Sequence, residues 1–162
     1  MNHLKDLFLH SIQDIYSAEQ QLIESTPELL DYASDCGIKR TFKTLLHDVK
    51  KHKHRIEAVC KSLHIHPTGR VCESIKGLIS DTQNLVATVK DRNILDAGLI
   101  ANALRAVHYE IAAYTVLVRY AQELLYSGAA ATFQDSLDEA ELAVHALDSL
   151  SAYRLDQRVI AV

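Results

Sequence analysis

Three ionisable residues occupy positions where the sequence pattern calls for apolar side chains. A fourth shares a helix face with one of them. Apolar residues recur at helical spacing along three long segments, and Glu19, His52 and Glu110 each occupy a core position in one of them. Asp48 precedes His52 by four residues, so the two side chains share a helix face. Buried carboxylates are costly unless a cation or a hydrogen-bond network compensates them. Carboxylate and imidazole groups suit iron, manganese or zinc, so these residues predict a metal site of undetermined metal.

A simpler interpretation competes with the metal site. A single core-facing Glu or His is usually satisfied by a tyrosine hydroxyl, an arginine or a water molecule. The sequence offers several such partners: Tyr16, Tyr109, Tyr114 and Arg105. For each residue alone this interpretation is favoured. The occurrence of core-facing ionisable residues on three different helices favours a metal site or the remnant of one.

The elements that must position these residues are helices. The apolar period predicts long helices over residues 2–36, 39–63, 93–126 and 129–155, with one short helix within residues 71–86. Two tightly joined helix pairs with a longer connection between them are the ferritin-like arrangement. We therefore predict an all-α chain, a ferritin-like four-helix bundle with a short helix in the crossover between the second and third long helices. Residues 1–162 suit a single domain.

Proline and glycine residues predict where the helices bend and end. We expect Pro27 to kink the first helix or to begin a second one. We expect Gly37 to cap the C-terminus of the first helix, and Ser127 with Gly128 to form the break before the last helix.

Composition excludes several classes of function. The chain has 162 residues and a net charge of −4, and the basic stretch over residues 50–55 is interpreted as a solvated helix face. We therefore expect no nucleic-acid partner. No apolar run is long enough to span a bilayer, and the N-terminus does not read as a secretory signal. Three cysteines without metal-type pairing suit reduced thiols, so we predict a cytoplasmic protein without a membrane partner.

Four stretches of the sequence resemble a known family. DLFLHSIQDIYSAEQQL (6–22), residues 47–57, VCESIKGLI (71–79) and VHYEIAAY (107–114) are similar to the YciE/YciF-type ferritin-like stress proteins of bacteria. The resemblance extends over most of the chain. It implies a bundle like those of rubrerythrins and ferritins, a homodimer, a link to stress responses, and a di-metal carboxylate site.

The ligand positions of that family are matched in part. Glu19 matches the glutamate of the first helix, and Glu110 matches the second glutamate of an E-H-Y-E segment. Asp48 stands where the family usually has Glu, and His52 stands where it has Gln or His. The resemblance therefore implies Glu19, Asp48, His52 and Glu110 as metal ligands.

Three positions depart from the family pattern. Val107 replaces the first glutamate of the E-H-Y-E segment, and Ala140 and Val144 replace a glutamate and an aspartate of the last helix. Less favoured ligands lie near these last two positions: Glu139, Glu141 and His145. Because a dinuclear centre uses carboxylates from all four helices, the site is expected to be partial.

Two functions follow from these expectations. The first is a ferritin-like stress-response protein with a partial carboxylate and histidine metal site, one or two iron or manganese ions, and an iron- or peroxide-related role. The second is a non-catalytic dimeric bundle, a scaffold or interaction protein that has lost the di-metal centre and binds no metal. Whether the chain is an enzyme stays open.

Overall fold

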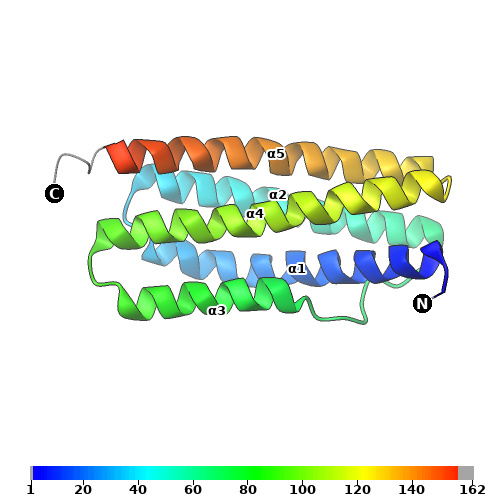
Figure 1. Ribbon diagram of the computed structural model, residues 1–162, viewed down its shortest axis with the longest axis horizontal. Helices are drawn as coiled ribbons and strands as arrows, with labels where there is room; N and C mark the ends of the chain where they lie inside the picture. The colour runs from blue at the N-terminus through cyan, green and yellow to red at the C-terminus, as the bar shows by residue number, and fades with distance from the viewer. Residues whose placement is uncertain (1, 157–162) are drawn as a thin grey trace.

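The chain is entirely helical over the residues that the structure describes. A computed structural model describes the backbone of residues 2–156 and the side chains as far as Tyr153. Its elements are α1 (Leu4–Tyr32), α2 (Cys36–Leu63), α3 (Glu73–Thr88), α4 (Arg92–Glu123) and α5 (Ser127–Asp156), with no strand among the described residues. The four long helices lie side by side along the long axis of the molecule, and the shorter α3 runs beside α1 and α4 (Figure 1). The prediction of an all-α chain is confirmed.

Aspartate side chains fix where two of the helices begin. Asp35 accepts hydrogen bonds from backbone N–H groups of the first turn of α2, including that of Gly37 at 2.7 Å. Asp91 caps α4 in the same way, through the N–H of Asn93 at 2.8 Å. The prediction that Gly37 ends the first helix is wrong, because α1 already ends at Tyr32 and Gly37 lies inside the capped turn of α2.

Two other predicted breaks also differ from the structure. α1 continues as one helix through Pro27, so the alternative that a second helix begins there is wrong. α5 begins at Ser127, which places Ser127 and Gly128 in its first turn rather than in the break. The reversal occurs before them, at Leu125, whose φ of 60° is left-handed.

The polar candidates lie at the junction of two apolar cores. Buried members of one core include Phe8, Ile12, Ile15, Tyr114 and Phe133, and those of the other include Phe42, Leu99, Val107, Ala140 and Leu147. Along α4, Glu110 lies between Val107 of the second core and Tyr114 of the first. Burial of large side chains on both sides, about 1.5–3 kcal/mol each, therefore holds the polar residues in the interior.

Between residues 2 and 156, no helix is both long and apolar enough to span a membrane.

Candidate metal centre

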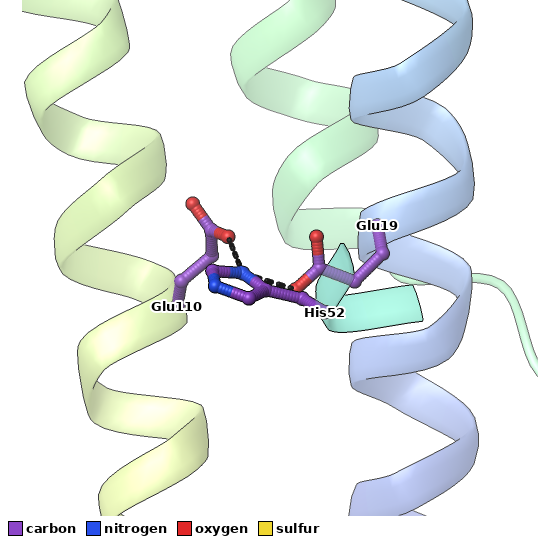
Figure 2. A group of neighbouring side chains, drawn as sticks. All are labelled: Glu19, His52 and Glu110. Carbon is purple, nitrogen blue, oxygen red and sulfur yellow. Dashed lines mark hydrogen bonds and ion pairs between the residues drawn. The ribbon is translucent and has the colours of Figure 1, made fainter. Parts of the chain in front are cut away.

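Three of the predicted ligands converge in the interior of the protein. Glu19 of α1, His52 of α2 and Glu110 of α4 point toward one another (Figure 2), and they are 0%, 2% and 3% exposed. One ligand atom from each lies within 4.8 Å of the others. The Nδ1 atom of His52 is 3.4 Å from Oε1 of Glu110 and 3.6 Å from Oε1 of Glu19. Two carboxylates and one imidazole nitrogen thus face a common point.

Glu19 is only half satisfied by the protein. The hydroxyl of Tyr114, itself fully buried, donates a hydrogen bond of 2.5 Å to Oε1 of Glu19. The second oxygen, Oε2, is buried and has no hydrogen-bond partner among the described residues. An unpaired buried carboxylate oxygen is costly. A cation or a proton at this oxygen would remove that cost.

The other ring nitrogen of His52 contacts a carboxylate on α5. Nε2 lies 3.2 Å from Oε2 of Glu139, which makes Glu139 the acceptor for an Nε2–H donor. Arg55 binds the same carboxylate through two donors, at 2.8 and 2.9 Å, and Lys51 adds a third contact at 2.7 Å. A carboxylate at one imidazole nitrogen favours the proton there and directs the other nitrogen toward a metal. Glu139 therefore orients Nδ1 of His52 toward Glu19 and Glu110.

Glu19, His52 and the neighbouring Glu139 differ sharply in pKa. Burial, reinforced by the charge of Glu110, raises the pKa of Glu19 to about 8. Burial would lower the pKa of His52, but hydrogen bonds and charges from Glu110 and Glu19 outweigh it and raise that pKa to about 10. The Arg55 guanidinium lowers the pKa of Glu139 to about 2. The cluster therefore holds protons at neutral pH without metal, and a metal ion would compete with them.

Other predicted ligands lie outside the cluster. Asp48 is partly exposed and lies 3.9 Å from the Lys51 ammonium, so the structure does not bring it to His52 and Glu110. Glu141 and His145 are exposed. Their side chains do not join the ligand atoms at the cluster.

The departures from the family pattern are apolar in the structure as well. Val107 and Ala140 are 4% and 2% exposed and belong to the same apolar core, with Val144 partly buried against it. Among the described residues of α5, Glu139 supplies the carboxylate in contact with the cluster.

Of the four candidate partners for a core-facing Glu or His, Tyr114 bonds one of them, Glu19. The other three bond elsewhere: Tyr16 to Glu57, Tyr109 to Asp14 and Arg105 to Asn102. A further buried carboxylate was not foreseen. Asp96 is 0% exposed and accepts hydrogen bonds from the N–H and hydroxyl of Ser34, at 2.8 and 2.6 Å. It shows how a buried carboxylate is satisfied without a metal.

The interpretation of residues 50–55 as a solvated face is wrong for part of the stretch. Arg55 and Lys51 reach across to Glu139 on α5, and their side chains are 23% and 41% exposed. The spacing of these residues offered a signal. Lys51 and Arg55 are four residues apart and therefore share a helix face, and Arg55 follows the core-facing His52 by three residues.

Comparisons with known proteins agree with this architecture. Protein YciF of Escherichia coli (strain K12) is 31% identical over 140 residues, which cover 86% of this chain and 84% of that protein. The crystal structure of the E. coli stress protein YciF superposes with a TM-score of 0.93 at 28% identity, covering 98% of this chain and 100% of the other. The structure of YcfI from Rhodopseudomonas palustris gives 0.88 at 32% identity, covering 91% and 94%.

A more distant structure shares the fold alone. A protein from Xanthomonas campestris pv. campestris superposes with a TM-score of 0.71 at 16% identity, covering 96% of this chain and 98% of the other. At the level of the family, a model described as a domain of unknown function, DUF892, matches residues 3–160. Because this match spans nearly the whole sequence, the chain belongs to the DUF892 family, as the resemblance of its segments to YciE/YciF-type proteins indicated.

Proposed function

We propose that this chain is a ferritin-like stress-response protein of the cytoplasm that holds one iron or manganese ion at Glu19, His52 and Glu110. The convergence of three buried ligand atoms on one point carries the proposal. The unpaired Oε2 of Glu19 supports it, because the protein leaves a lone pair of a buried carboxylate without a donor. The stress role is suggested by YciF, which is described as a stress protein. Bound iron or manganese would supply redox chemistry toward peroxide.

The ferritin-like classification is supported by the order and packing of the helices. α1 with α2 and α4 with α5 form two pairs with short connections, and α3 lies in the longer connection between them. This is the connectivity of ferritin-like bundles, which build metal sites from inward-facing carboxylates and histidines. Residues 1–162 are proposed to form one such domain. Met1 and residues 157–162 lie outside the described residues.

One metal ion is proposed rather than two because of the α5 side of the cluster. Dinuclear sites of this type take a carboxylate from each helix. Glu139, the α5 glutamate beside the cluster, is already paired with basic side chains. Glu139 binds the guanidinium of Arg55 and the ammonium of Lys51. These fixed positive charges oppose a second cation, and the buried Ala140 and Val107 supply no oxygen.

Metal content tests this proposal directly. Protein purified without chelator is expected to carry about one equivalent of Fe or Mn per chain by elemental analysis, or to take up that amount on titration. Glu19→Gln and Glu110→Gln keep the side-chain shape, remove the anionic ligand, and are expected to lose the metal. Glu141→Gln is the matched control, because Glu141 is exposed on α5. Less than about a tenth of an equivalent, with no uptake on titration, would refute the metal site.

The second candidate is a non-catalytic dimeric bundle that holds protons instead of metal. The raised pKa values of Glu19 and His52, about 8 and 10, support it, because both groups then keep their protons at neutral pH beside Glu110. This candidate predicts a homodimer by light scattering and a melting temperature that does not change when chelator is added. A melting temperature that falls with chelator supports the metal site instead.

A further inference from the structure

A cavity of about 70 Å³ lies between α1, α2, α3 and α4, and Glu110 forms part of its wall. Its other walls include Leu29 of α1, Phe42 of α2, Ile79 of α3 and Val107 of α4. The exposed Glu28 lies on its solvent side, whereas Glu110 is 3% exposed. The cavity therefore leads from the surface to one carboxylate of the Glu–His–Glu cluster.

Small side chains on α4 account for the hollow. Ala103, Ala106 and Val107 line one wall, and larger apolar side chains of the other helices line much of the rest. Val107 stands where the sequence resemblance places a glutamate, so this wall of the cavity is carbon rather than carboxylate. An unfilled space of this kind costs stability, and a fitting occupant restores the lost contacts.

Three buried polar side chains in the wall are already bonded within the protein. Asn102 donates to the hydroxyl of Thr82 at 3.0 Å, and that hydroxyl donates to the carbonyl of Leu78 at 2.8 Å. The hydroxyl of Thr26 donates to the carbonyl of Leu22 at 2.6 Å. These donors are therefore not available to recognise a polar ligand. The wall offers mainly carbon, which suits an apolar ligand.

The volume of the cavity and the charges in its wall restrict the class of ligand further. Drug-sized ligands need pockets of about 300–1,000 Å³, so this cavity admits a molecule of only a few heavy atoms. Two carboxylates in the wall, Glu28 and Glu110, disfavour anions. Apolar cavities in protein interiors do bind xenon and other apolar molecules.

We propose that this cavity binds a small, neutral, apolar molecule, and that dioxygen is the ligand it brings to Glu110. Binding in the cavity requires only the geometry above. The use of dioxygen at the cluster rests on the metal centre proposed for Glu19, His52 and Glu110.

Two gases probe the cavity in the full chain after metal removal by chelator. Xenon under pressure is expected to give saturable methyl shifts by NMR, and dioxygen under pressure is expected to enhance methyl relaxation. Both effects should be largest at Leu29, Ile79 and Val107, and small at Leu147, which is buried but does not line the cavity. Shifts that do not saturate, or relaxation effects as large at Leu147, overturn the proposal.

A pair of matched variants locates the gas. Ala103→Leu adds three carbon atoms to the cavity wall, and Ala113→Leu makes the same change at a partly buried α4 position outside it. Ala103→Leu is expected to abolish the xenon shifts while Ala113→Leu retains them. Equal loss in both variants, or retention in both, overturns the location.

Metal titration of the same chelator-treated protein, after the chelator is removed, separates the two proposals. Xenon binding by wild-type protein that takes up no metal supports the cavity and refutes the metal centre. Metal uptake without any saturable xenon or dioxygen effect refutes the cavity and leaves the metal centre standing.

Discussion

Replacing Tyr114 with Phe removes one hydroxyl from the centre of the core and tests how the cluster is held together. That hydroxyl donates to Oε1 of Glu19 at 2.5 Å, and the other oxygen of Glu19 already lacks a partner. The pKa of Glu19 is about 8, so its side chain is mostly neutral at pH 6 and mostly charged at pH 9. Burial and the neighbouring Glu19 charge raise the pKa of Tyr114 well above its usual value, so it still donates at pH 9.

The expected cost of Tyr114→Phe therefore depends on pH. At pH 6 the lost bond has a neutral acceptor and is worth about 1 kcal/mol. At pH 9 a fully buried carboxylate loses its donor, and the free energy of unfolding is expected to fall by about 2–3 kcal/mol. For a chain of this length, that loss lowers the melting temperature by about 5–10 °C.

Urea denaturation of the metal-free protein at both pH values measures the effect. Tyr16→Phe is the control, because its hydroxyl bonds to Glu57 at 3.0 Å and the Glu57 side chain is 36% exposed. It is expected to cost less than about 1 kcal/mol at either pH. Equal losses for Tyr114→Phe at pH 6 and pH 9, or a loss below about 0.5 kcal/mol at pH 9, would contradict the reasoning.

Three further predictions concern the surroundings of the cluster. Arg55→Gln removes two hydrogen bonds to Glu139 and is expected to cost about 1–3 kcal/mol at pH 7 by urea denaturation. This cost should disappear as the pH falls from about 4.5 through 2, because Glu139 has a lowered folded-state pKa of about 2 and becomes protonated; a constant cost contradicts the pairing. The metal-free protein is expected to lose stability as the pH rises from about 5 to 10, because the raised pKa values of Glu19 and His52, about 8 and 10, mean that the folded state binds more protons. Denaturation at pH 6 and pH 9 measures this loss of stability. Bound metal should reduce the loss, because the metal replaces those protons. Stability of the metal-free protein that rises with pH contradicts the prediction. Glu141→Gln should change the free energy of unfolding by less than about 0.5 kcal/mol and leave the metal content unchanged, because the side chain is exposed.

The helices were predictable because an apolar period of 3.6 residues is a local property of the sequence. Their ends were predicted less well. Asp35 starts α2 through hydrogen bonds to its first turn, which places Gly37 inside the helix. The reversal before α5 depends on a left-handed conformation at Leu125, and residue type would have favoured a glycine there.

The residues of the candidate metal site were predictable in part, because the apolar stripe of a helix is also a local property of the sequence. Glu19, His52 and Glu110 lie on the apolar stripes of their helices, and a residue on such a stripe faces the interior in any bundle that buries it. Asp48 lies at the edge of its stripe and stays partly exposed beside Lys51. Successive residues turn by about 100° around a helix, so position within a stripe decides whether a side chain reaches the centre.

The sequence by itself determined that the chain is all-α and that three helices carry ionisable residues on their buried faces. Only the tertiary structure decided how those residues meet: Nδ1 of His52 faces Glu19 and Glu110, while Nε2 faces Glu139. The contact between Arg55 and Glu139, 84 residues apart in the chain, was decided in the same way. The physical reason is that each helix encodes its own buried face. The rotation and axial offset of one helix against another follow from the packing of all the side chains between them.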